Sequence, residues 1–241
     1  MSFLLALLTG FTAALAHVLS GPDHLAAVIP FAIEEKKKSW KIGFAWGLGH
    51  LTGMLMIGLL FYFLKENIQL DSISAYSEII VGFILIAIGI WAITKASGRG
   101  FVKKYWHFHI SSNNFLHKHK GDIHNDTDHH TTIQAQKKLN NNTSAYYIGV
   151  IHGFAGIAHF ILFLPVLGFD SIKLITAYIS GFAAGTILAM VVFAFILGHL
   201  SYRLVNAPGN YPAFKILRFA SGILAIAVGI YWILVSSQVP E

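Results

Sequence analysis

Two histidine pairs occur at identical spacing in the two halves of the chain. The first pair is His17 and His24, the second is His152 and His159, and both segments fit the pattern H-xxx-G-xx-H-xxxxx-P. Each segment lies in or beside a long apolar run, where an imidazole is costly to bury unless the protein uses it. An imidazole nitrogen also offers a lone pair to a metal ion. The repeated pattern therefore predicts a polar site between the two halves, built for a cation.

Two further residues of the apolar runs are candidate ligands. Asp23 precedes His24 and is the only acid clearly within an apolar run. A bound dication would compensate its charge, but a carboxylate in the first turn of a helix also stabilises the helix N-terminus, so both roles stay open. His50 follows two glycines that permit close helix approach. It is either part of the site or an ordinary packing residue.

The composition is that of a membrane protein. Hydrophobic residues make up 55% of the chain and charged residues 12%, and the mean hydropathy is +0.63. Six apolar stretches can cross roughly 30 Å of hydrocarbon. Five of them cover approximately 41–64, 75–94, 145–169, 172–199 and 214–236.

The sixth stretch runs from about residue 3 to residue 33 and is too long for one upright span. We expect one broken helix, with the break at Gly21-Pro22. No Lys or Arg precedes the apolar residues 3–16, as a signal peptide would require, so we expect them to remain part of this helix.

Lys and Arg predict the orientation in the membrane. All but Lys65 and Lys173 of the 17 basic residues fall in the segments after the first, third and fifth spans. The positive-inside rule places those segments in the cytoplasm and both termini outside the cell membrane. The net charge of +6 therefore reflects membrane topology, and we expect no nucleic-acid partner.

The repeat extends through both halves. The matching glycines, in the same order, are Gly43, Gly47, Gly82 and Gly89 in the first half and Gly181, Gly185, Gly222 and Gly229 in the second. Each half contains an odd number of spans, so the second half must be inverted. We predict an all-α integral membrane protein with six transmembrane helices, built from inverted three-helix repeats at 1–95 and 145–241. Repeats of this kind place a substrate site near the membrane midplane.

Residues 96–144, between the repeats, are predicted to form a disordered cytoplasmic loop. Its seven histidines are His107, His109, His117, His119, His124, His129 and His130. Imidazoles interspersed with carboxylates suit borderline divalent ions, so we expect loose and exchangeable metal binding. The alternative is a polar linker that happens to be rich in histidine.

The chain contains no cysteine and only four methionines. This composition excludes disulfides, thiolate metal sites and thiol–disulfide exchange by the chain's own side chains. It also argues against a copper(I) carrier, which would need soft sulfur ligands.

The segments Ala16 to Ala27 and Trp46 to His50 resemble the membrane proteins of the nickel/cobalt NicO and urease-accessory UreH type. The resemblance extends over all six spans and the His-rich loop. It implies a secondary transporter, proton-coupled or otherwise driven, that carries Ni²⁺ or Co²⁺ as substrate and holds no tightly bound cofactor. It further implies that His17, Asp23 and His24 are the principal ligands. Efflux is slightly favoured, because such a loop is typical of the efflux branch.

Other functions stay open at this point. Five residues separate His17 from Asp23, where nickel permeases typically have four, and related proteins are labelled as sulfite exporters. A membrane-bound metallo-oxidase, a haem protein with two histidines as axial ligands and a non-transporting assembly factor are further alternatives. We expect a divalent metal ion and the bilayer as partners and no enzymatic activity. A homodimer and a cytosolic metallochaperone are compatible with the sequence.

Deleting residues 107–130 should weaken metal transport at low metal concentration and leave transport at saturating metal largely intact. Loose surface ligands raise the local ion concentration without forming the path. The measurement is the initial transport rate across a range of metal concentrations, with expression and membrane insertion matched. Loss of transport at every concentration would mean that the loop belongs to the path itself.

Overall fold

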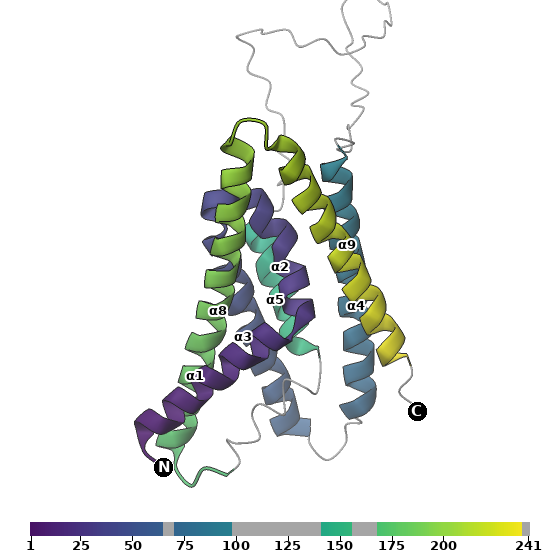
Figure 1. Cartoon of the computed structure of the whole chain (residues 1–241). Coiled ribbons are helices and arrows are strands. Elements are labelled where there is room, and N and C mark those ends of the chain that lie inside the picture. Colours follow the sequence, from purple (N-terminus) through teal and green to yellow (C-terminus); the bar gives the residue numbers. More distant parts are fainter. Residues whose placement is uncertain (65–69, 98–140, 156–167, 238–241) are drawn as a thin grey trace, which may run out of the picture.

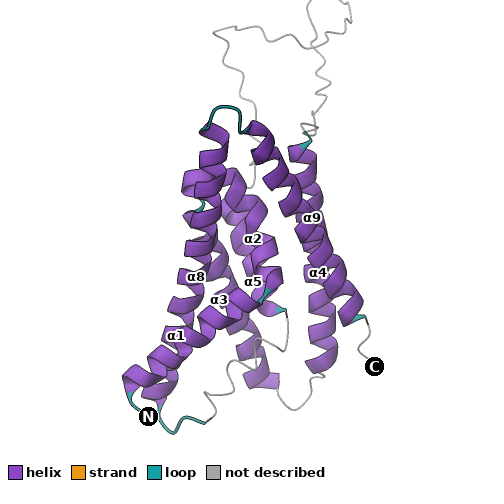
Figure 2. Ribbon diagram, in the orientation of Figure 1, coloured by secondary structure: helices purple, strands orange, loops and turns teal. Residues whose placement is uncertain are grey.

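Helices are the regular secondary structure of the described part of the chain. The computed structural model describes residues 1–64, 70–97, 141–155 and 168–237, and no strand occurs among them (Figures 1 and 2). The helices are α1 (Phe3–Ser20), α2 (Pro22–Glu35), η1 (Lys36–Lys38), α3 (Trp40–Leu64), α4 (Leu70–Ala96), α5 (Asn141–Phe154), α8 (Ile172–Asn206) and α9 (Tyr211–Ser236). The predicted all-α fold is confirmed.

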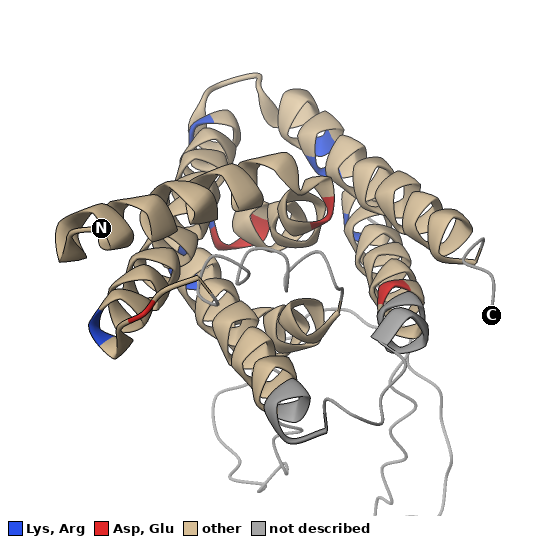
Figure 3. Cartoon of the chain, turned by 90° about the horizontal axis from the view of Figure 1, so that it is seen from below, with Lys and Arg blue, Asp and Glu red and all other residues tan. Residues whose placement is uncertain are grey.

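Five of the described helices are long and apolar enough to cross a membrane. They are α1, α8, α9 and the segments Trp40–Leu59 of α3 and Tyr76–Ala96 of α4. Their outer faces expose large apolar side chains, such as Phe83 on α4 and Leu234 on α9. Charged residues occupy few positions on the helices (Figure 3). An apolar exterior of this kind is stable in lipid, and the chain is a multi-pass membrane protein.

The remaining predicted span, 145–169, lies only partly within the described residues. Its first part is α5, which ends at Phe154, and residues 156–167 lie outside the described ranges. At the other boundaries, α8 continues to Asn206 rather than ending near residue 199. A helix that leaves the hydrocarbon can continue with polar residues, and Arg203 and Asn206 lie in the last turns of α8.

The first span is broken where the sequence predicts. α1 ends at Ser20, Gly21 lies between the helices, and Pro22 begins α2. Proline suits the first position of a helix, because its fixed φ fits there and no partner for an N–H is needed. In Figure 1, α1 runs obliquely from the N-terminal end towards the centre of the bundle, and α2 rises from that point to the opposite end. The break therefore places the first turn of α2 deep inside the protein.

Helices of the two halves pack in three pairs. The most extensive contacts are those of α1 with α8, α3 with α5, and α4 with α9. If each helix is replaced by its counterpart in the other half, the α1–α8 pair becomes the α5–α3 pair, and the α4–α9 pair is unchanged. This is the pattern expected of an inverted repeat, and the contacts are compatible with that prediction.

Glycines form the contact between α4 and α9. A Cβ atom on Gly229 would lie 2.6 Å from the carbonyl oxygen of Gly82, and one on Gly222 would lie 2.7 Å from that of Gly89. The sequence repeat equates Gly82 with Gly222 and Gly89 with Gly229, so exchanging the halves maps each contact onto the other. Figures 1 and 3 both show α4 and α9 as a pair beside the other helices.

The two ends of the bundle differ in charge. The start of α1 and the end of α9 lie at one end, and the α8–α9 turn lies at the other (Figure 1). The lysines of η1 lie near that second end, and Arg203 in the last turns of α8 and Lys215 early in α9 flank the turn. The arrangement agrees with the predicted topology, and which end faces the cytoplasm stays a prediction.

Replacing Gly82 or Gly222 by valine should separate α4 from α9 and destabilise the protein by about 1–3 kcal/mol, because the added atoms overpack a backbone contact. Gly58→Val in α3 is the control, since a Cβ atom at Gly58 meets no atom within 4 Å. The measurement is the apparent unfolding temperature in detergent. Equal temperatures for the three variants would contradict the proposed glycine contact.

Candidate metal centre

A buried carboxylate lies between imidazoles from the two halves of the chain. Asp23 is in the first turn of α2, and its Oδ1 lies 3.0 Å from Nδ1 of the adjacent His24. Its Oδ2 lies 2.7 Å from Nε2 of His152, in the last turn of α5. The three residues are buried, with exposed fractions of 7%, 2% and 2%. The carboxylate thus connects the first half of the protein with the second.

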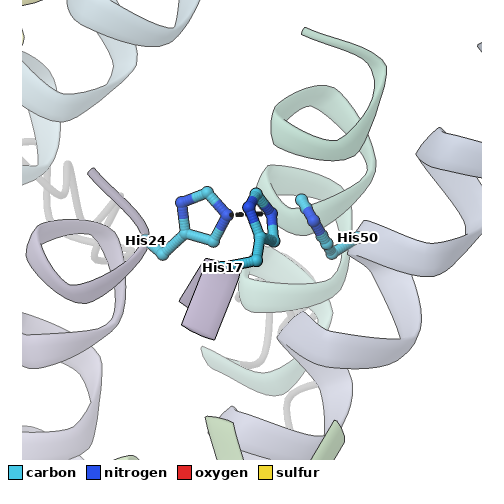
Figure 4. Close-up of side chains that lie close together, drawn as sticks. All are labelled: His17, His24 and His50. Atoms are coloured by element: carbon cyan, nitrogen blue, oxygen red, sulfur yellow. Dashed lines mark hydrogen bonds between the residues drawn. The ribbon is translucent and has the colours of Figure 1, made fainter. Parts of the chain in front are cut away.

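Two further imidazoles lie on the other side of His24. Nε2 of His17, in the last turn of α1, is 3.0 Å from Nε2 of His24. The ring of His50, on α3, is centred 5.8 Å from His17 and 5.0 Å from His24. Figure 4 shows the three rings converging from separate helices. The break at Gly21 makes this possible, because it places the end of α1 beside the start of α2.

Gly21 also supplies the space for these side chains. A Cβ atom at this position would lie 2.7 Å from Nδ1 of His24 and 3.0 Å from Oδ1 of Asp23. No larger residue fits without displacing one of the candidate ligands. The backbone at Gly21 lies so close to His24 and Asp23 that this position of the pattern requires glycine.

The hydrogen bonds fix where the protons lie when Asp23 is ionised. A carboxylate only accepts, so Nδ1–H of His24 and Nε2–H of His152 both donate to it. A neutral His24 then carries its lone pair on Nε2 and accepts a hydrogen bond from Nε2–H of His17. The result is a continuous hydrogen-bonded chain of four side chains, from His17 through His24 and Asp23 to His152. A cation can replace a proton that two of these side chains share.

Two overlapping groups of residues could hold a metal ion. One is His17, His24 and His50, and the other is Asp23, His24 and His152; within each group the ligand atoms lie within 4.8 Å of one another. His24 belongs to both, with Nδ1 towards Asp23 and Nε2 towards His17. A set of imidazoles and one carboxylate, without sulfur, suits nickel, cobalt and zinc.

Trp46 is a residue of the site that the sequence reasoning missed. It lies one turn before His50 on α3, and the two rings stack with their centroids 4.9 Å apart. The same indole is 5.3 Å from the ring of His24 and 5.5 Å from that of His152. Its spacing of four residues from His50 is the signal that could have identified it. Trp46 supports the rings of the site and is itself buried.

The structure brings together five of the six predicted intramembrane ligands: His17, Asp23, His24, His50 and His152. His159 and the seven histidines of the predicted loop lie outside the described residues. His50 lies beside His17 and His24, and its role as a ligand stays a prediction. Metal binding by these residues stays a prediction.

Comparison with known proteins identifies the family. The family described as "Cytochrome C biogenesis protein transmembrane region" matches residues 3–231, which include every helix of the site. The chain belongs to this family. Membership in a transmembrane family agrees with the apolar helices found here.

Three relatives of this transmembrane protein are informative. The urease accessory protein UreH of Bacillus sp. (strain TB-90) is 33% identical over 198 residues, which cover 81% of this chain and 77% of UreH. The chloroplast proteins FOR GROWTH AND FERTILITY 1 and 2 of Arabidopsis thaliana are 30% and 29% identical over 223 residues. The chain spans a little over half the length of these two, 57% and 54%. No solved structure matches.

Asp23→Asn should lower the affinity for Ni²⁺ or Co²⁺ by about tenfold or more, because an amide keeps the size of the side chain but removes the negative charge that attracts a dication. The measurement is calorimetric metal binding to purified protein in detergent. Asp170→Asn is the matched control, since it removes one negative charge from an exposed position. Unchanged affinity in Asp23→Asn would mean that Asp23 only stabilises the start of α2.

Proposed function

We propose that the protein is a secondary membrane transporter of divalent transition-metal cations, with Ni²⁺ or Co²⁺ as the favoured substrate. The observation that carries the proposal is the Asp23 carboxylate between His24 and His152, with His17 and His50 beside it. This cluster is buried within an apolar bundle and combines residues from both halves. Polar groups in such a place are costly and mark ion or substrate paths in membrane proteins.

The position of the cluster supports transport rather than permanent metal storage. The ligands come from four helices, α1, α2, α3 and α5, so relative movement of these helices changes the coordination of the ion. His24 faces one ligand group with each of its nitrogens, which offers the ion two neighbouring positions. Sites that conduct ions combine binding with easy release, and neighbouring sites favour such release.

The relatives support the same class of function. UreH is named a urease accessory protein, and the resemblance of residues 16–27 and 46–50 to NicO and UreH-type proteins implies nickel or cobalt. Imidazole and carboxylate ligands are compatible with either ion. We favour efflux slightly, with the His-rich loop in the cytoplasm and the protein in the cell membrane.

Two observations weigh against the other functions. The family takes its description from cytochrome c biogenesis, but this chain has no cysteine with which to exchange a disulfide. A haem would need His17 or His24 on one face of the porphyrin and His152 or His159 on the other, whereas the rings of His24 and His152 are centred only 4.7 Å apart. Cation transport needs neither a cysteine nor space for a porphyrin between the histidines.

Purified protein in proteoliposomes should carry Ni²⁺ or Co²⁺ faster than Mn²⁺ and should not carry sulfite, because the site presents nitrogen ligands and one anionic group. The measurement is flux of each ion into vesicles. His24→Ala should reduce the flux at least tenfold, because both ligand groups lose a shared member. Sulfite flux without metal flux, or a haem Soret band in the purified protein, would refute the proposal.

A further inference from the structure

A cavity of about 780 Å³ lies between α2, α4 and α5, separate from the histidine cluster. Its walls include Phe31 of α2, Trp91 of α4 and Ile148 of α5. Polar side chains line it as well, among them Glu35 and Asn141. These two residues lie where α2 ends and α5 begins, at the end of the bundle that carries the lysines of η1.

Two of the helix faces that line the cavity continue to the candidate metal centre. On α5, Ser144, Ile148 and His152 follow one another at intervals of four residues and share one face. On α2, Phe31 lies seven residues after His24, which is two turns or roughly 10 Å along the helix. The inner end of the cavity therefore lies one to two helical turns from the Asp23–His24–His152 group.

A thin apolar layer separates the cavity from the site. Ala26 and Ala27 of α2 pack with Leu85 of α4 in one buried cluster, against which Ile148 also packs. The candidate ligands beyond this layer are buried. The apolar layer thus lies at the inner end of the cavity beside the site, and the polar lining residues Glu35 and Asn141 lie towards the basic end.

Two carboxylates, Glu34 and Glu35, lie at the outer end of the cavity. Glu34 forms ion pairs with Lys95, at 3.0 Å, and with Arg218. Glu35 accepts a hydrogen bond of 2.6 Å from Nδ2 of Asn141. Both of these cations are thus paired with Glu34, and the Glu35 carboxylate is held by the amide of Asn141. Glu35 is the acid whose side chain lines the cavity.

We propose that this cavity is the aqueous vestibule through which the cation passes between the basic end of the bundle and the histidine–aspartate centre, and that Glu35 is its first ligand. The inference rests on the proposed transport function. Phe31 and Trp91, whose rings stack at 5.2 Å, give the vestibule a weakly binding wall. A wall of this kind lets an ion pass on to the next site rather than holding it.

Cysteine substitution tests whether the cavity holds water, and the native chain has no cysteine to interfere. Ile84→Cys on α4 and Ser144→Cys on α5 place a thiol at half-buried positions of the cavity lining. The matched controls are Ile90→Cys and Tyr147→Cys, on the exposed outer faces of the same helices. A charged, membrane-impermeant thiol reagent is added to each side of the proteoliposomes in turn.

The cavity thiols should react about tenfold faster or more than the controls, because only a thiol in water ionises readily to the reactive thiolate. They should react from the side of the basic end only, and the modification should reduce Ni²⁺ flux at least tenfold. Equal modification rates at all four positions, or reaction only from the side opposite the basic end, would overturn the vestibule proposal. Labelling does not depend on flux, so absence of Ni²⁺ flux in the unmodified protein would count against the transport function alone.

A second variant tests the ligand at the entrance. Glu35→Gln retains an oxygen that accepts the hydrogen bond from Asn141 but loses the charge. It should raise the half-saturating Ni²⁺ concentration about threefold or more without changing the maximal rate, since a mouth ligand raises the local ion concentration without forming the central site. Asp170→Asn is the control for loss of one negative charge. An unchanged half-saturating concentration would remove Glu35 from the path.

Discussion

The arrangement of the bundle depends on the pairing of one buried carboxylate. An ionised Asp23 in an apolar interior is costly, by several kcal/mol, unless polar partners surround it. His24 supplies one partner from the same helix turn, and His152 supplies the other from the second half of the chain. The α2 turn and the end of α5 must therefore meet. The first turn of α2 reaches this position because of the break at Gly21. The end of α5 reaches it because α5 packs closely on α3.

Close packing of α3 and α5 comes from small residues. Gly149 and Gly153 of α5 lie directly against the backbone of α3 at Trp46 and His50, where no side chain would fit. Because α3 and α5 approach so closely, the rings of Trp46 and His50 stack, and the ring of His152 lies tilted against both. The glycines thus have two functions: they join the halves, and they fix the distances between the candidate ligands.

Features encoded by single residues or by repetition were predictable from the sequence. The break follows from the missing N–H and fixed φ of Pro22. The repeated H-xxx-G-xx-H pattern singled out His17, His24 and His152, and Asp23 stood out as an acid within an apolar run. The features that were missed depend on how helices rotate against one another. The contacts of Trp46 with His24 and His152, the pairing of Glu34 with Lys95 and Arg218, and the cavity all join residues far apart in the chain. Hydropathy carries no information about such contacts.

The break at Gly21 also makes the two ligand groups mechanically different. α1 is a rod of 18 residues, about 27 Å long, whose inner end carries His17. α2 begins on the other side of the break and carries Asp23 and His24. A change of angle at Gly21 therefore alters the distance between His17 and His24 but leaves the pairing of Asp23 with His24 intact. The geometry of one ligand group thus depends on the angle between α1 and α2, whereas that of the other depends on the pairing of α2 with α5.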